Sequence, residues 1–199
     1  MKIRNIIITA LLAVVGFVVS MVGGMFTKFF GAYGIFVHVS IGSLLCGPIF
    51  IAMCRKLKTR GTIFIYYAIM GIVYAIMGFI PMTAVMVIAG LIGEILIANV
   101  KNYEKNRRIG ISYLVSELIY ALHGFLLLLA FGTEGLAETF PNLFTLEKAQ
   151  AIKTIFFDPK NMTVIVIVQI VASALGIMLG QYVYKKFFDR AIKKDGILQ

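Results

Sequence analysis

The sequence predicts an all-α membrane protein with six transmembrane helices, in a single domain that spans residues 1–199. Its 199 residues are 60% hydrophobic with a mean hydropathy of +0.95, whereas an ordinary globular domain is roughly 45–50% apolar. Fifteen of the 19 Lys and Arg residues fall in four short segments between long apolar runs, namely Lys2–Arg4, Arg55–Arg60, Lys101–Arg108 and Lys185–Lys194. Such segments flank membrane spans on the cytoplasmic side.

Six apolar stretches are long enough to cross a bilayer core, which needs about 20 helical residues. In chain order, we expect spans at residues 5–24, 35–54, 61–80, 82–100, 109–131 and 162–184. The first resembles a signal peptide, but no A-x-A site follows it, so we expect it to remain as a span. Pro81 suits the first turn of the fourth helix. With six crossings the basic segments share one side, which places both termini in the cytoplasm.

Residues 132–161 form the long outer connection between the last two spans. Within it, Thr145 can cap a short amphipathic helix. The apolar residues of that helix share one face, and they are Leu146, Ala149, Ile152 and Phe156. Asp158-Pro159 ends the helix. Two interpretations stay open at this stage: the helix is a lid over a cavity, or it lies flat at the membrane interface.

Small residues follow one face of two spans. In the first span they are Thr9, Ala13, Gly16, Ser20 and Gly24, and in the sixth they follow Gln169 as Ala172, Ser173, Gly176 and Gly180. Small side chains let helix backbones approach each other closely in a membrane. Each face therefore either packs inside the bundle or docks a partner protein.

Four ionisable side chains lie inside the spans, namely His38, Glu94, Glu117 and His123. Burying a charged side chain at the centre of a span costs at least about 2.5 kcal/mol, so these residues face the bundle interior, a cavity or a partner. We predict that the two histidines, Tyr120 and Gln169 line an outward-opening vestibule for a substrate. The two acids form its floor or a polar network below it, and the alternative is a purely structural polar pair or a protonated Glu.

Several chemistries are excluded by the residues that the chain lacks. It has neither a Walker A motif nor H-E-x-x-H, so we expect no ATP hydrolysis in this chain, no catalytic residues and no cofactor. Cys46 and Cys54 are interpreted as small membrane residues rather than as a disulfide or metal ligands. The basic residues flank spans instead of forming a stripe with aromatic residues, which argues against nucleic acid as a partner.

The opening of the chain and its first outer loop resemble a known family. The residues concerned are Ile6-Ile7-Ile8-Thr9-Ala10-Leu11-Leu12-Ala13-Val14-Val15-Gly16, followed by the aromatic residues Phe26, Phe29, Phe30 and Tyr33. Together with the six-span layout, they are similar to the Trep_Strep or MptD-type S components of energy-coupling factor (ECF) transporters. The resemblance implies a multi-pass protein of the bacterial plasma membrane that captures a vitamin-like micronutrient outside the cell.

The resemblance also implies partners. An S component docks on the membrane subunit EcfT, which carries two ABC ATPases, and releases its substrate inward. Docking in that family uses an A-x-x-x-A stripe on the first helix. The nearest match here is Thr9-x-x-x-Ala13, followed by Gly16 and Ser20, so Thr replaces the first Ala of the pattern.

The sequence leaves two other functions open. The chain could be a stand-alone secondary transporter that uses Glu94 and Glu117 as proton sites, or a membrane enzyme that uses Glu117 and His123. The last two residues are six positions apart, about 9 Å along a helix, and cannot bond directly within one helix. An aromatic vestibule with two histidines suits a planar heteroaromatic vitamin, with a haem-like ligand as the second candidate. A metal ion fits less well, because no carboxylate or thiol clusters near the histidines in sequence.

Overall fold

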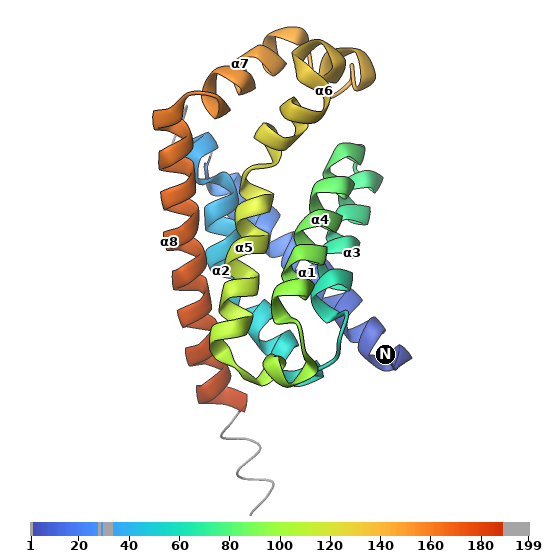
Figure 1. Cartoon of the computed structure of the whole chain (residues 1–199), viewed down its shortest axis with the longest axis vertical. Coiled ribbons are helices and arrows are strands. Elements are labelled where there is room, and N and C mark those ends of the chain that lie inside the picture. Colours follow the sequence, from blue (N-terminus) through green and yellow to red (C-terminus); the bar gives the residue numbers. More distant parts are fainter. Residues whose placement is uncertain (1, 28, 30–33, 189–199) are drawn as a thin grey trace, which may run out of the picture.

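The computed structural model describes residues 2–27, 29 and 34–188, and every element within these ranges is helical (Figure 1). In chain order the elements are α1 (Ile3–Phe26), α2 (Gly34–Leu57), α3 (Thr62–Ile76), α4 (Ile80–Ile97), η2 (Val100–Glu104), α5 (Asn106–Ala121), α6 (His123–Thr139), α7 (Leu146–Phe156), α8 (Pro159–Val183) and η3 (Tyr184–Phe188). The η2 segment is a 3-10 helix and η3 is a π-helix. Several residues of the sequence predictions lie outside the described residues, namely Phe30, Tyr33, Arg190, Lys193 and Lys194.

Five stretches are long and apolar enough to cross a membrane within the described part of the chain. They are Ile3–Phe26, Phe36–Leu57, Ile80–Ile97, Asn106–Thr139 and Pro159–Phe188. These stretches confirm the predicted all-α membrane protein. Pro81 stands in the first turn of α4, as predicted.

The third predicted span, 61–80, is longer than the helix that forms there. The α3 helix contains 15 residues, about 22 Å at 1.5 Å per residue, which is shorter than a hydrocarbon core of about 30 Å. It ends at Ile76 because Gly78 adopts a φ of 91° and turns the chain toward α4. A crossing at α3 therefore depends on a helix shorter than the hydrocarbon core. The total of six crossings stays a prediction.

The fifth predicted span, 109–131, is divided rather than continuous. The α5 helix ends at Ala121, and α6 continues from His123 with a second break at Gly132, where φ is 68° and ψ is 179°. Residues 132–139, which we expected in a loop, thus belong to the helical segment. As a result, α6 and α7 lie across the end of the bundle and lead back to α8 (Figure 1).

The small-residue face of α1 is turned into the bundle. Thr9 and Ala13 are fully buried, and Ser20 is 8% exposed. Gly16 has no room for a Cβ beside the Tyr66 hydroxyl of α3, and Gly42 of α2 has none beside Ser20. In this structure the predicted docking residues Thr9, Ala13, Gly16 and Ser20 bring α1 against α2 and α3, and docking of a partner on them stays a prediction.

The small residues of α8 have the same role against α2. A Cβ added to Gly176 would lie 2.7 Å from the Ser43 carbonyl oxygen, and one added to Gly180 would lie 2.8 Å from the Gly47 carbonyl oxygen. Both stripes therefore pack internally, and larger residues face outward. Outward-facing residues include Leu11 and Val18 on α1 and Ile167 and Met178 on α8, as expected of helices that face lipid.

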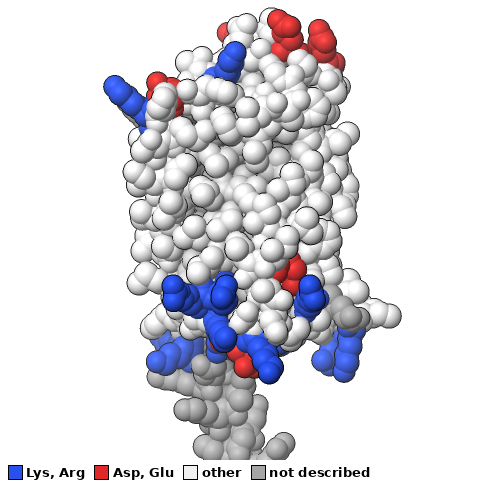
Figure 2. Space-filling model, viewed as in Figure 1, with Lys and Arg blue, Asp and Glu red and all other residues white. Residues whose placement is uncertain are grey.

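Charge is distributed unevenly over the surface. Figure 2 shows most Lys and Arg side chains gathered at one end of the molecule, below a wide belt without charged side chains, and both acidic and basic side chains at the other end. The basic end contains the connection from α2 to α3 and the η2 segment. This separation matches the alternating charge of the sequence.

Candidate functional site

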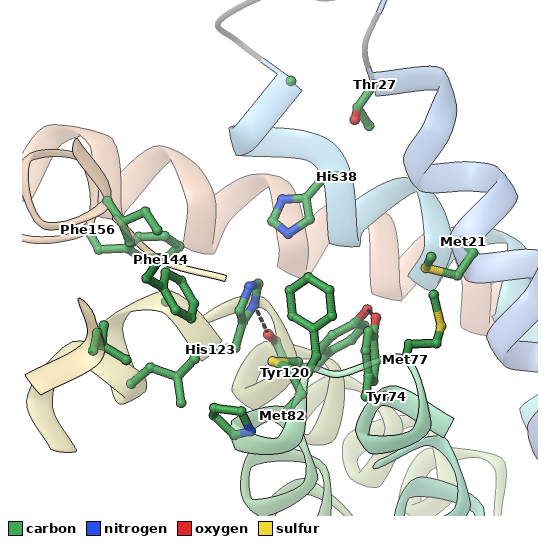
Figure 3. A pocket seen from close by; sticks show the side chains of 17 residues that line it. Met21, Thr27, His38, Tyr74, Met77, Met82, Tyr120, His123, Phe144 and Phe156 are labelled. Atoms are coloured by element: carbon green, nitrogen blue, oxygen red, sulfur yellow. Dashed lines mark hydrogen bonds between the residues drawn. The ribbon is translucent and has the colours of Figure 1, made fainter. Parts of the chain in front are cut away.

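A cavity of about 510 Å³ lies among the helix ends on the side opposite the basic end, and Figure 3 shows the side chains that line it. Each helix from α1 to α7 contributes to its wall. Contributing residues include Met21, His38, Tyr74, Met82, Tyr120, His123 and Phe156. Its size falls within the range of small-molecule sites, about 300–1,000 Å³.

The wall of this cavity is mostly apolar and aromatic. It includes Met77, Leu127 and Phe144 besides the residues above, and no described residue that lines it carries a formal charge. A desolvated ionic group of a ligand would therefore lack a counter-charge among these residues. The lining favours a neutral ligand with a large apolar surface.

His38 and His123 meet inside the cavity (Figure 3). Their ring centroids are 5.4 Å apart at an interplanar angle of 76°. The Nδ1 atom of His123 lies 2.9 Å from the Tyr120 carbonyl oxygen. Because a carbonyl oxygen only accepts, Nδ1 carries the proton, and the Nε2 atom of a neutral imidazole is then an acceptor. His123 can thus offer a ligand an acceptor nitrogen beside the aromatic wall.

Tyr74 joins the site and was missed by the sequence reasoning. Its hydroxyl is hydrogen-bonded to the Tyr120 hydroxyl, and its ring packs edge-on against Phe17 with centroids 4.9 Å apart. The α3 helix contains no Asp, Glu, His, Lys or Arg, so its aromatic residues did not stand out in the sequence. The available signal was the seven-residue spacing of Tyr67 and Tyr74, which places them on one helical face.

The α7 helix covers the cavity with its apolar face. Ile152 and Phe156 line the cavity, and the rings of Phe156 and His123 lie 6.5 Å apart between centroids. The predicted cap is confirmed, because the Thr145 hydroxyl accepts a hydrogen bond from the Lys148 amide at 3.2 Å. Of the two interpretations of this helix, the structure therefore matches the cover over a cavity.

Gln169 does not line the cavity, contrary to our prediction. Its side chain is fully buried. Its amide nitrogen donates to the hydroxyls of Ser43 at 2.8 Å and Ser173 at 3.0 Å, and its oxygen accepts from Ser40 at 2.9 Å. Every polar atom of this amide is engaged, which joins α8 to α2.

Glu117 lies in the same buried network. Its two carboxylate oxygens accept from the Ser43 hydroxyl at 2.5 Å and the Tyr67 hydroxyl at 2.7 Å. Of the two arrangements that we predicted for this acid, the structure shows the polar network, which links α5 to α2 and α3. Glu117 and His123 have different partners, so they do not form the acid–base pair that an enzyme would need.

Glu94 belongs to neither the wall of the cavity nor the hydrogen-bond network of Glu117. Its carboxylate accepts hydrogen bonds from the backbone amides of Gly61 at 2.8 Å and Ile63 at 3.1 Å. The Tyr103 hydroxyl donates to the same carboxylate at 2.7 Å. Glu94 therefore caps the start of α3, where the glycine at the cap position supplies no side chain. Burial and the neighbouring carboxylate raise the pKa of Tyr103.

The cysteines lie away from the cavity. Cys46 and Cys54 are buried free thiols. Among residues 2–27, 29 and 34–188, no group of three or more His, Cys, Asp or Glu side chains could hold a metal ion.

The fold and the cavity define an all-helical membrane protein with a ligand-sized site at one end of its bundle. The chain belongs to the Trep_Strep family, described as hypothetical bacterial integral membrane protein, whose sequence model matches residues 3–190. It is thus a multi-pass bacterial membrane protein. No curated protein and no solved structure matches the chain.

Proposed function

We propose that this protein is the substrate-binding S component of an ECF-type importer. In this proposal the chain crosses the membrane six times with both termini inside, and α3 is the short crossing. It captures a small micronutrient outside and delivers it inward by docking on EcfT. Two partner ATPases hydrolyse ATP, because the chain lacks a Walker A motif.

The cavity is the observation that carries the proposal. It lies at the end opposite the basic segments, which is the outer end if the positive-inside rule applies. It is large enough for a vitamin-sized molecule and is covered by α7. A binding subunit needs a covered outer site of this kind, and it does not need catalytic groups.

The residues that line the cavity also indicate which class of ligand it binds. A neutral ring system can stack among Tyr74, Tyr120 and Phe156, and a single N–H or O–H group of the ligand can donate to Nε2 of His123. The uncharged wall disfavours polyanionic nutrients. A planar heteroaromatic compound with few charges fits these features best.

The secondary-transporter alternative gains no support from the acids. Glu94 accepts hydrogen bonds from two backbone amides at the start of α3 and from the Tyr103 hydroxyl, and Glu117 accepts hydrogen bonds from two hydroxyls. Neither acid is in the wall of the cavity. A proton site coupled to a substrate would be expected to contact that substrate or its water.

Native mass spectrometry of the protein purified from its own membranes tests the binding site. We expect a bound organic molecule of vitamin size, and a His123→Ala variant that retains much less of it. Leu129→Ala is the matched control, since Leu129 is on the same helix and 60% exposed. A ligand retained equally by both variants would remove His123 from the site.

A second experiment tests the assignment to an importer. The tagged chain should co-purify from its native membranes with an EcfT-type subunit and two ATPases, and uptake of the identified molecule should require ATP. If the purified chain alone moved that molecule across liposomes down a proton gradient, the proposal would be overturned in favour of a secondary transporter.

A further inference from the structure

A second hollow lies at the basic end of the molecule, about 410 Å³ in volume, between α2, the start of α5 and the end of α8. Its polar wall consists of Arg55, Asn106, Gln181 and Lys185. We call this hollow the basic groove. It is separate from the cavity described above, because the two share no lining residue.

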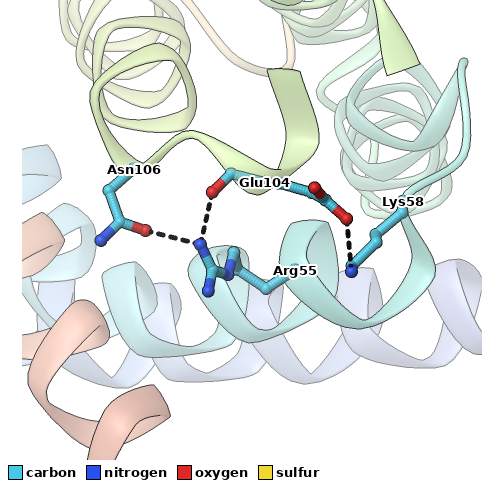
Figure 4. A network of polar contacts seen from close by, with 4 residues as sticks. All are labelled: Arg55, Lys58, Glu104 and Asn106. Carbon is cyan, nitrogen blue, oxygen red and sulfur yellow. Dashed lines mark hydrogen bonds and ion pairs between the residues drawn. The ribbon is translucent and has the colours of Figure 1, made fainter. Parts of the chain in front are cut away.

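Among the described residues, Arg55 forms no hydrogen bond with a carboxylate, although that of Glu104 is close. Its Nη1 atom donates to the Glu104 carbonyl oxygen at 2.5 Å and to the Asn106 side-chain oxygen at 3.1 Å (Figure 4), and both acceptors are neutral. The Glu104 carboxylate is instead paired with Lys58 at 2.7 Å, and the Lys58 ammonium lowers the pKa of Glu104. Within the described part of the chain the guanidinium thus donates only to neutral oxygens, although it also interacts electrostatically with the nearby Glu104 carboxylate, and Nε and Nη2 have no hydrogen-bond partner there.

The guanidinium is also held in place by aromatic contacts. Its carbon lies 5.1 Å from the centroid of the Tyr184 ring. That ring stacks on Phe188, with centroids 5.3 Å apart and an interplanar angle of 15°. Both rings belong to the π-helix η3, a type of segment that often marks functional sites. Arg55 is thus oriented before any ligand arrives, which lowers the entropic cost of binding.

Two further sources of positive potential meet the groove. Lys185 lines it directly. The α5 helix begins at Asn106, and no side chain caps its first turn, so the positive end of its dipole is directed to this region. An anion with several acceptor oxygens would satisfy these donors.

Opposite its polar wall, the basic groove has an apolar end, which opens toward the uncharged belt of the surface. It contains Ile51 and Met178, and Met178 is 65% exposed. Tyr182 stands between the two ends and is 60% exposed, in the position typical of an aromatic residue at a membrane interface. A free anion would not need this apolar wall, whereas a lipid has an acyl chain for it.

We propose that the basic groove binds the phosphate group of an anionic phospholipid. The phosphate accepts hydrogen bonds from Arg55 and Lys185, and the acyl chain lies along Met178 and Ile51. The site requires neither the outer cavity nor a partner subunit. Soluble phosphate esters share the phosphate chemistry, and the experiment separates the two sources.

The experiment titrates the full-length protein in mild detergent with dioctanoyl phosphatidylglycerol, dioctanoyl phosphatidylcholine and glycerol phosphate, and counts bound molecules by native mass spectrometry. We expect phosphatidylglycerol to bind about tenfold more tightly than phosphatidylcholine, from its net charge beside two cations. Lys185→Gln should weaken the binding of phosphatidylglycerol about fivefold. Arg55→Gln should weaken it further, and Arg55→Lys should recover part of the loss because it restores the charge without the planar fork.

Lys56→Gln is the matched control, since Lys56 is an exposed cation adjacent to Arg55 in the sequence and does not line the groove. It should change the affinity less than about twofold. Equal binding of the two lipids, or an equal loss in the Lys185 and Lys56 variants, would overturn the proposal. If glycerol phosphate bound as tightly as phosphatidylglycerol, the groove would be a site for soluble phosphate esters, and the proposal of a lipid ligand would be overturned. Because Arg55 also bonds the η2 segment, Lys185→Gln decides the outcome if the Arg55 variants do not fold.

Discussion

Replacing Glu94 separates a structural role from a role in transport. The carboxylate serves two backbone amides at the start of α3 and the Tyr103 hydroxyl. Hydrogen bonds to a charged group contribute roughly 1.5–3 kcal/mol each, but bonds that share one carboxylate are not additive. Glu94→Gln keeps the shape and one acceptor oxygen, and it places an amide nitrogen where an acceptor is required. We expect the variant to lose about 2–3 kcal/mol of unfolding free energy.

The measurement is thermal unfolding followed with a thiol-reactive dye, because Cys46 and Cys54 are buried and become reactive when the bundle opens. For a chain of this length, 1 kcal/mol corresponds to about 2–4 °C, so Glu94→Gln should unfold about 4–12 °C lower. Glu134→Gln is the control, since Glu134 is exposed on α6. Tyr103→Phe should lower the temperature less, and the double variant should lose less than the sum of the two.

One result would refute this reasoning. If Glu94→Gln unfolded at the temperature of the unchanged protein and yet lost ligand retention or transport, Glu94 would be a functional acid and not a cap. The secondary-transporter alternative would then regain its proton site.

Two further predictions concern packing and charge. Gly176→Ala should cost about 1–3 kcal/mol of stability, because its Cβ would lie 2.7 Å from the Ser43 carbonyl oxygen, whereas Gly135→Ala, with its nearest contact at 3.6 Å, should be neutral in the same dye assay. The Lys58 ammonium lowers the pKa of Glu104, so the pair contributes fully above the ordinary Glu pKa of about 4.3 and is lost as the pH falls through the lowered value. The unfolding temperature should therefore show a small decrease over that pH interval, which Lys58→Gln abolishes; a decrease of the same size in the variant would count against the pair.

Much of the fold was predictable because hydropathy and capping residues indicate each helix from its own segment of the sequence. Apolar runs and their charged borders located the membrane helices, and Thr145 and Asp158-Pro159 marked the ends of α7. The errors fell at Gly78, at Leu122 and at Gly132. At these positions a backbone conformation ends or bends a helix inside an apolar run, and hydropathy does not change there.

The candidate site was predictable only in part. His38, Tyr120 and His123 do line one cavity, as polar groups on inward faces should. Tyr74 was missed, and Gln169 and Glu94 are hydrogen-bonded outside the wall of that cavity. Which buried polar group faces a cavity and which is consumed by hydrogen bonds depends on neighbours from other helices, such as Ser40 for Gln169 and Gly61 for Glu94.

By itself, the sequence determined that the protein is an all-helical membrane protein with its basic charge at one end, because the cost of burying charge in lipid acts on each segment separately. Only the tertiary structure decided the roles of particular residues. A stripe of small residues looks the same whether it faces a partner or a neighbouring helix, and the α1 stripe packs inward here with the Tyr66 hydroxyl against Gly16 and Ser20 against Gly42. Likewise, the two acids became a helix cap and a network member because their hydrogen-bond donors come from helices distant in sequence.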